Sequence, residues 1–306
     1  NWHGASLLDY FSDNEYWFQA NLAAVKAFPQ VLFLPGFWAE YGMCSEPASF
    51  GAKCSFYENE FPFAHPLSDA LNSIRRPDPR TDGLTPFLLR RLERMRPRIE
   101  AAGHSLRFAV ARGPLNIAAF LMGASEFLMA LRTEPDQAHR MLDTITCFLE
   151  DWLRLQKERI DTIDGILLLD DIVGFLGEED FKEFAKPYVT RAFAAFEASV
   201  RFFHNDAHGL VCAPHLADMG INLFNFGYDH TMPEMQRLTG GKVTLLGNIP
   251  PRDVLAKGTP AEVAESVRQL LDSIADTRRV ILSCGGGMPP GVSTENIEAF
   301  LNAVIH

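Results

Sequence analysis

The sequence predicts a parallel α/β fold, and more specifically a (β/α)8 barrel. Short apolar runs alternate with amphipathic helical stretches along the 306 residues. Several of these runs lack polar–apolar alternation, which is typical of strands buried on both faces of a parallel sheet. Strand–helix repetition indicates an α/β architecture. The length fits a barrel of about 250 residues with insertions.

Seven apolar runs are the expected strands, at 31–37, 106–113, 165–171, 200–206, 222–227, 242–248 and 279–287. A barrel has eight strands, and the chain begins at Asn1 without a methionine. We therefore expect its N-terminal part to be truncated, with an eighth strand ahead of Asn1. No GxGxxG follows the first run, so the dinucleotide-binding open sheet lacks its signature.

Amphipathic helices are expected between these runs, at 15–28, 86–103, 134–159, 178–196 and 260–275. In the last of them, Val263, Val267, Leu270 and Leu271 recur every three to four residues, which indicates one buried face. Segment 38–83 is rich in Gly, Pro and aromatic residues and is expected to be an insertion that forms a lid over the barrel mouth. With no linker visible, residues 1–306 are predicted to form a single barrel domain.

Composition narrows the function classes. A formal net charge of −11 argues against a broad nucleic-acid surface, and the basic stretch at 90–98 is interpreted as a solvated helix face. No apolar run approaches the ~20 residues of a membrane span, and no signal peptide is visible. Five scattered cysteines without CxxC predict a reduced, cytoplasmic protein.

The expected site lies at the carboxyl ends of the strands, where barrel enzymes place their chemistry. Asp170 and Asp171 point to opposite faces, so one carboxylate faces inward; Asp171 is preferred, as a proton-handling group. Either aspartate could instead cap a turn or pair with Arg112, the strand-end cation that completes the expected catalytic set. Five further residues are expected to bind substrate: Phe37, Trp38, Asn225, Asn248 and His208. The aromatic pair could equally be core.

The stretch RFFHNDAHGL at 201–210 indicates a metal site. His204 and Asp206 are two residues apart and share one strand face. Cys284, at the end of another strand, is the expected third ligand, with His208 as a substitute, because catalytic zinc takes three protein ligands and keeps one open position. The alternatives are a buried, hydrogen-bonded His204 and a core Cys284.

Several motifs together resemble the uroporphyrinogen decarboxylase superfamily: GPL at 113–115, LLLDDIVGFL at 167–176, FNFG at 224–227, TLLGNIPPRDVL at 244–255 and ILSCGGGMPPGVSTENIEAF at 281–300. This resemblance covers nearly the whole chain. It implies a (β/α)8 barrel with one of two activities, porphyrinogen decarboxylation or methyl transfer involving cobalamin proteins.

The chain departs from both branches of this superfamily. The GHG of the decarboxylases reads Gly285-Gly286-Gly287, and LPGFW at 34–38 replaces their early aspartate strand end. The zinc-binding His-x-Cys of the methyltransferases reads His204-Asn205-Asp206, and their later cysteine position is Gly286. The decarboxylase substrate is polyanionic and calls for several cationic anchors, whereas Arg112 is the one clear strand-end cation.

The resemblance therefore favours a methyltransferase that moves a methyl group to or from a corrinoid carried by a partner protein, assisted by zinc. A diverged decarboxylase and a non-catalytic binding barrel are the alternatives. Apolar side chains on the outer helices would permit a homodimer.

Overall fold

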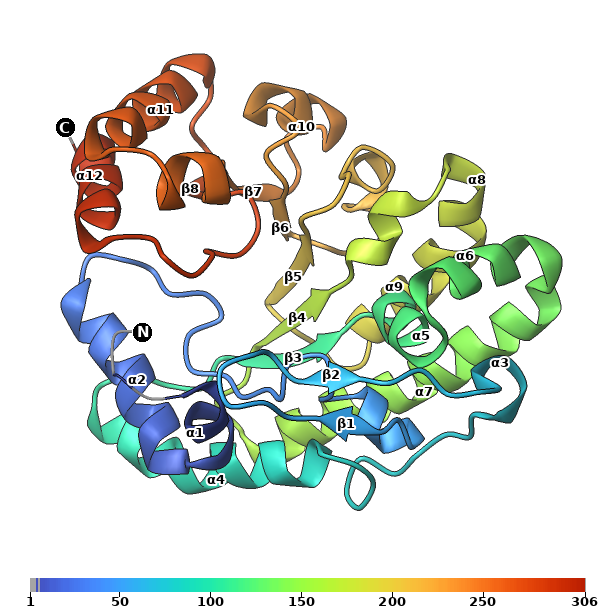
Figure 1. Ribbon diagram of the computed structural model, residues 1–306. Helices are drawn as coiled ribbons and strands as arrows, with labels where there is room; N and C mark the ends of the chain where they lie inside the picture. The colour runs from blue at the N-terminus through green and yellow to red at the C-terminus, as the bar shows by residue number, and fades with distance from the viewer. Residues whose placement is uncertain (1–3, 5, 306) are drawn as a thin grey trace. The chain divides into compact units, whose positions relative to one another are not determined.

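The computed structural model describes residue 4 and residues 6–305, and it confirms the α/β class (Figure 1). Within these residues, six strands form one sheet in the order β3-β4-β5-β6-β7-β8, with helical segments between successive strands. The strands are β3 (Phe108–Arg112), β4 (Gly165–Leu169), β5 (Val200–Asn205), β6 (Leu223–Phe226), β7 (Thr244–Ile249) and β8 (Val280–Cys284). Each coincides with a predicted run.

Strand pairing explains why these runs read as continuously apolar. Strands β5 to β8 pair in parallel, and every residue of β6 is buried. Register places His204 of β5 beside Asn225 of β6, and Asn248 of β7 beside Ser283 of β8. The carboxyl ends of neighbouring strands consequently meet at one edge, as the sequence predicts.

The prediction of a strand at 31–37 is wrong. Those residues form turns and irregular backbone, because Pro35 has no N–H to donate to a ladder and Gly36 has a positive φ of 84°. The extra strands of the described chain lie instead within segment 38–83. They are β1 (Cys54–Ser55) and β2 (Phe63–Ala64), which form an antiparallel pair.

The chain divides into two compact units. The first comprises residues 1–167 and 187–199. Its helices are α1 (Leu7–Ser12), α2 (Asn14–Ala27), η1 (Pro47–Phe50), α3 (Ala70–Ser73), α4 (Thr85–Ala101), α5 (Pro114–Met122), α6 (Ala124–Thr133), α7 (Pro135–Arg159) and, but for its first residue, α9 (Lys186–Phe193). Helices α2, α4 and α7 agree closely with the predicted ones. The expectation of a single domain stays a prediction.

The second unit comprises residues 168–186 and 200–306. Its helical segments are η2 (Asp171–Phe175), α8 (Glu178–Asp180), η3 (Phe181–Ala185), η4 (Ala213–His215), α10 (Met232–Leu238), η5 (Pro251–Ala256), α11 (Pro260–Ser273) and α12 (Thr294–Ile305). Helices α11 and α12 lie side by side (Figure 1). The predicted face of α11 is buried through Val263 and Val267, which pack with Ile249 and Leu255.

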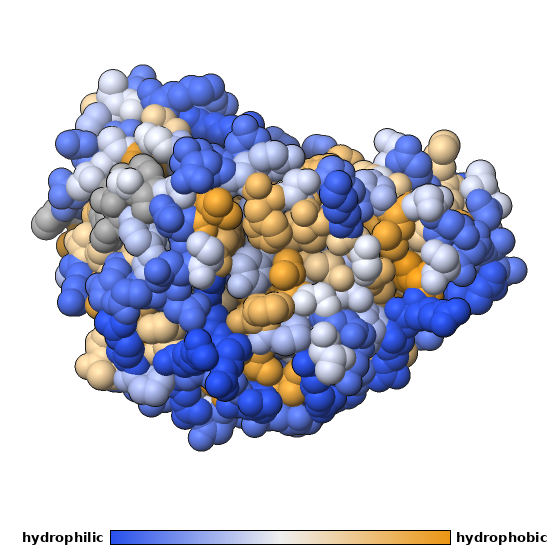
Figure 2. All heavy atoms as spheres, turned by 60° about the horizontal axis from the view of Figure 1, so that its bottom comes forward, coloured by the Kyte–Doolittle hydropathy of each residue, from blue (hydrophilic) through white to orange (hydrophobic). Residues whose placement is uncertain are grey.

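Apolar side chains on the surface are scattered. Figure 2 shows hydrophobic groups separated by hydrophilic residues on one face. Around the β1–β2 pair, four aromatic side chains are 38–54% exposed: Phe56, Tyr57, Phe61 and Phe63. No single described helix is long and apolar enough to cross a membrane; only α5 and α6 taken together, bent by 106°, reach that length and composition.

Among the basic side chains of the stretch 90–98, only that of Arg91 is buried. Arg90 is exposed and pairs with Glu93, whereas Arg91 is 2% exposed. The Arg91 guanidinium donates to Asn14 Oδ1 at 2.9 Å and to the Phe11 carbonyl. Arg91 therefore anchors α4 to the N-terminal helices.

Replacing Arg91 by alanine should lower the free energy of unfolding by about 2–4 kcal/mol, because hydrogen bonds from a charged donor are worth ~1.5–3 kcal/mol each. Arg90→Ala is the matched control one residue away. It loses only an exposed ion pair and should cost less than ~1 kcal/mol. Urea unfolding followed by circular dichroism measures both, and equal losses would contradict the anchoring role.

Candidate functional site

Two carboxylates and one imidazole converge at the ends of β4 and β5. Asp171 is the first residue of η2, directly after β4 and Asp170. His204 lies near the end of β5, and Asp206 follows that strand. One ligand atom from each of Asp171, His204 and Asp206 lies within 4.8 Å of the others. In the part of the chain that the structure describes, this is the one group of three such side chains.

Hydrogen bonds to backbone fix this group. The Asp206 N–H donates to Asp171 Oδ1 at 3.0 Å, and the Asp170 N–H donates to the His204 carbonyl at 3.0 Å. His204 Nε2 lies 3.8 Å from Asp206 Oδ2. The His204 side chain is 15% exposed and that of Asp206 is 45% exposed. The group is thus open to solvent on the Asp206 side.

The group carries unbalanced negative charge. Burial raises the pKa of Asp206, and the nearby carboxylate of Asp171 raises that pKa further, while His204 partly opposes the shift. Two carboxylates beside one imidazole suit a cation, since carboxylate and imidazole are both ligands of zinc. A cation would remove the repulsion that raises the Asp206 pKa.

The absence of a side chain at Gly286 leaves room for the side chain of Asp206. A Cβ at Gly286 would lie 2.7 Å from both the Cβ and Oδ2 of Asp206, and its φ of +97° disfavours any side chain. A Cβ at Gly227 would come within 2.6 Å of the Asp206 carbonyl. The backbone after β6 and β8 therefore packs directly on Asp206. A side chain at position 286 would overlap the side chain of Asp206, so the two departures from the family pattern, at Asp206 and Gly286, are linked.

Cys284, the expected third metal ligand, is outside the group of three. It is 8% exposed and packs in the apolar cluster with Ile249, Leu255 and Val263. Its thiol donates to the Gly286 carbonyl at 3.1 Å. Burial raises the pKa of this thiol, and a metal ligand must be the thiolate. The role of Cys284 as a ligand stays a prediction, and Asp171 holds the corresponding place in the structure.

Three predicted polar residues are buried. Asp170 is fully buried, so Asp171 is the aspartate that joins the group. The Asn225 amide donates to the carbonyls of Leu246 and Cys284, at 2.8 and 3.3 Å. The Asn248 amide donates to the carbonyls of Gly227 and His230. Both asparagines link neighbouring strand ends, and their expected substrate contacts stay predictions.

Arg112 is enclosed by acidic side chains. Its guanidinium lies 2.7 Å from Glu40 Oε2 and 3.5 Å from Glu46 Oε2. Glu46 is 2% exposed, and burial raises its pKa. Arg112 therefore neutralises two carboxylates of its own unit, and its expected catalytic role stays a prediction.

Phe37 and Trp38, the two aromatic residues expected to bind substrate, have different surroundings. Phe37 is 4% exposed and stacks on Phe18, with Trp17 at 6.1 Å between ring centroids. Trp38 is partly exposed. His208 lies opposite Asp229, with Nδ1 at 3.8 Å from Oδ2, and is not a member of the Asp171, His204 and Asp206 group.

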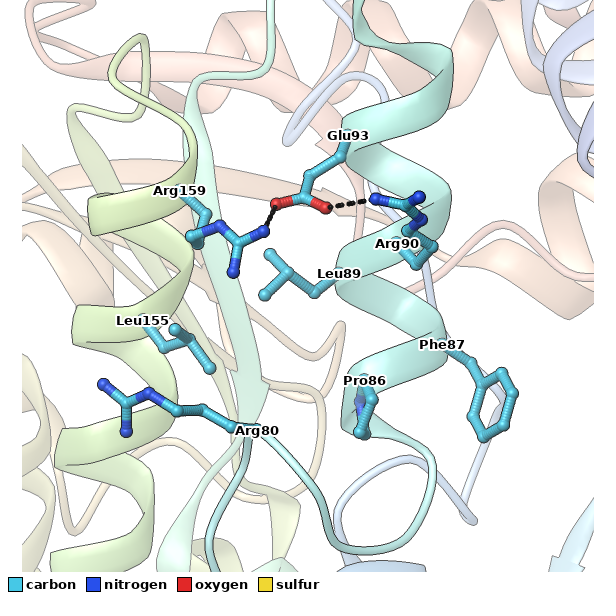
Figure 3. A pocket seen from close by; sticks show the side chains of 8 residues that line it. All are labelled: Arg80, Pro86, Phe87, Leu89, Arg90, Glu93, Leu155 and Arg159. Carbon is cyan, nitrogen blue, oxygen red and sulfur yellow. Dashed lines mark ion pairs between the residues drawn. The ribbon is translucent and has the colours of Figure 1, made fainter.

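A separate hollow of about 400 Å³ opens between α4 and α7. It is lined by Arg80, Pro86, Phe87, Leu89, Arg90, Glu93, Leu155 and Arg159. Figure 3 shows Arg90 and Arg159 pointing at Glu93 from opposite sides, at 3.6 and 2.5 Å. Because this carboxylate already occupies both guanidinium groups, the hollow is a less suitable site than the strand-end group.

Sequence reasoning missed two features of the strand ends. Asp171, the expected proton-handling group, also brings a carboxylate oxygen within 4.8 Å of possible ligand atoms of His204 and Asp206. His230 and Glu234, beyond β6, were not singled out, although they approach each other at 3.8 Å. The available signal was the segment YDH at 228–230, which follows the FNFG strand end.

Asp206→Asn should stabilise the metal-free protein at pH 7. A carboxyl whose pKa is raised by folding contributes stability below its unfolded pKa, and this contribution is lost as pH rises through the folded pKa. Asparagine cannot ionise, so the gain should appear at neutral pH and vanish below about pH 4. Thermal melts in chelator at several pH values measure this. Asp253→Asn, on the same unit and 69% exposed, should show no gain; a destabilised Asp206→Asn protein at pH 7 would contradict the account.

Gly286→Ala should displace Asp206, because the new Cβ would sit 2.7 Å from its carboxylate. We expect a loss of about 1–3 kcal/mol in stability from the positive φ and at least tenfold weaker zinc binding. Gly287→Ala is the matched control, since no described atom lies within 4 Å of a Cβ there. Calorimetric zinc titration of the two variants decides the matter, and unchanged zinc binding in Gly286→Ala would refute the role of this contact.

Comparison with known proteins identifies a family. The family model described as uroporphyrinogen decarboxylase (URO-D) matches residues 2–306. The uroporphyrinogen decarboxylase of Chlorobaculum parvum is 26% identical over 179 residues, which cover 56% of this chain and 49% of that protein. The enzyme of Xylella fastidiosa is 24% identical over 277 residues, covering 84% and 76%. The match thus spans about half the length of the first relative.

Solved structures share the fold. A methyltransferase from Methanosarcina mazei superposes with a TM-score of 0.82 at 18% identity, covering 98% of this chain and 87% of that one. A B12-independent methionine synthase from Shewanella sp. W3-18-1 superposes with a TM-score of 0.59 at 13% identity, covering 95% and 87%. The fold is therefore that of the TIM-barrel-like relatives, and the chain belongs to the uroporphyrinogen decarboxylase (URO-D) family.

Proposed function

We propose that this chain is a methyltransferase that moves a methyl group to or from a corrinoid carried by a partner protein, with zinc held by Asp171, His204 and Asp206. The observation that carries the proposal is the convergence of these three ligands within 4.8 Å at the strand ends. The fold shared with a methyltransferase at a TM-score of 0.82 supports it.

The donor set fits zinc. One imidazole and two carboxylates are all accepted ligands, and three protein ligands leave a fourth position open for substrate. The exposed side of Asp206 gives that position access to solvent. Burial and the Asp171 carboxylate raise the pKa of Asp206, and a bound cation would oppose that shift by favouring the ionised carboxylate.

Bound zinc would act as a Lewis acid that lowers the pKa of a thiol or hydroxyl acceptor. The residues of the chain would then have separate tasks. His204 and Asp206 would hold the ion at the strand ends. Asp171 fixes Asp206 by accepting its backbone N–H and stands ready to take the acceptor proton. Trp38, partly exposed in the aromatic segment after residue 37, would contact substrate or corrinoid.

Decarboxylation is the second candidate, because the curated relatives from Chlorobaculum parvum and Xylella fastidiosa are uroporphyrinogen decarboxylases. Two observations weigh against it. Arg112, which would anchor substrate carboxylates, is already paired with Glu40 and Glu46. Gly286, at the histidine position of the decarboxylase motif, has no room for a side chain beside Asp206.

His204→Ala should remove one equivalent of bound zinc and abolish methyl transfer together, because it removes the one imidazole of the group. The control is His215→Ala, which changes another half-buried histidine of the same unit, paired with Glu178. Zinc is measured by elemental analysis of protein purified from zinc-supplemented medium. Methyl transfer is followed by the absorbance of free methylcobalamin with a small alkyl thiol as acceptor. The His215→Ala protein should behave as the unmutated one.

The same preparations separate the alternatives. Absence of zinc from the unmutated protein, with no change in the cobalamin spectrum, would refute the proposal. Carbon dioxide release from uroporphyrinogen would then support the decarboxylase. If neither reaction occurs and uroporphyrinogen only raises the melting temperature, the chain is a binding barrel.

A further inference from the structure

The loops after β5 and β6 bring two histidines together outside the proposed zinc group. His208 follows the end of β5, and His230 follows the end of the neighbouring, parallel strand β6. The two imidazole centroids are 6.1 Å apart, with planes inclined by 59°. The loop that carries His208 packs directly on Gly174, since a Cβ at Gly174 would lie 2.7 Å from the backbone nitrogen of His208.

Each imidazole has a carboxylate behind it. His208 Nδ1 lies 3.8 Å from Asp229 Oδ2, and His230 Nδ1 lies 3.8 Å from Glu234 Oε2. At 3.8 Å these carboxylates attract the rings without accepting a hydrogen bond from them. A nearby carboxylate commonly orients a metal-binding histidine. Nε2 is the other ring nitrogen of both residues, and it is the atom that a ligand would take.

His230 Nε2 supplies an independent indication of a ligand. The His230 side chain is 10% exposed, and its Nε2 is buried with no hydrogen-bond partner among the described residues. Such a group costs ~1–3 kcal/mol of desolvation when nothing binds it. The residue is also anchored, because the Asn248 amide donates to its carbonyl and Glu234 is carried by helix α10.

We propose that His208 and His230 form a second divalent-metal site, which takes zinc or another imidazole-preferring ion through the two Nε2 atoms. With a zinc–nitrogen bond of ~2.0–2.1 Å, the ion lies roughly 3.2 Å from each ring centroid, and tetrahedral zinc needs centroids ~5.2 Å apart. The observed 6.1 Å is about 1 Å wider, a gap that rotation of the 65% exposed His208 side chain would close on binding. Imidazole ligands select zinc, copper or nickel over calcium and magnesium. Two protein ligands leave positions for a substrate oxygen or nitrogen.

The test removes the first site and keeps the second. In the full chain carrying His204→Ala and Asp206→Ala, zinc titration by calorimetry should still show one equivalent bound. Adding His230→Ala or His208→Ala should weaken binding at least tenfold, whereas adding His215→Ala should not. Glu234→Gln keeps both ligands and should weaken binding about tenfold, as loss of a supporting carboxylate does. Magnesium should not bind.

A second measurement covers variants that fail to fold. In the same His204→Ala, Asp206→Ala background, zinc should protect exposed His208 from modification by diethyl pyrocarbonate, read by peptide mass spectrometry. Absence of zinc binding in this background, or equal modification of His208 with and without zinc, would overturn the second site. Neither result bears on methyl transfer, which is assayed with His204 and Asp206 intact.

Discussion

Two carboxylates held against each other at the strand ends are the constraint on which the site depends. The Asp206 N–H donates to Asp171 Oδ1, so the backbone after β5 is tied to the side chain after β4. This bond keeps the two acids together although their charges repel. Burial raises the pKa of Asp206, and the Asp171 carboxylate raises it further. Folding thus prepares a place that a proton or a metal ion must neutralise.

Close approach of glycine backbones builds the rest of this edge. Gly227 after β6 and Gly286 after β8 both lie against Asp206. A Cβ added at either glycine would come within 2.6–2.7 Å of an Asp206 atom, which is too close. A larger residue at 286 and an aspartate at 206 are therefore mutually exclusive in this arrangement. The residues at these two positions act as a pair, because the absence of a side chain at Gly286 makes room for Asp206.

The hydrophobic pattern of the sequence predicted the six-stranded sheet and the position of the site. Parallel strands buried on both faces give long apolar runs, and their carboxyl ends meet at one edge. His204 and Asp206 could be paired from their spacing alone. The strand predicted at 31–37 failed because of tertiary context, since this run contains Pro35 and does not pair. Cys284, whose role as a ligand stays a prediction, packs in an apolar cluster. Asp171 joins the ligand group through a hydrogen bond that no sequence pattern encodes.

The identity of the third ligand tests the central claim most directly. X-ray absorption at the zinc edge of the zinc-loaded protein distinguishes oxygen and nitrogen ligands at ~2.0–2.2 Å from sulfur at ~2.3 Å. The variant Asp171→Asn, measured alongside, shows whether that carboxylate contributes. The account predicts a first shell of oxygen and nitrogen only, altered by Asp171→Asn. A sulfur ligand in the unmutated protein would contradict it and assign that place to Cys284.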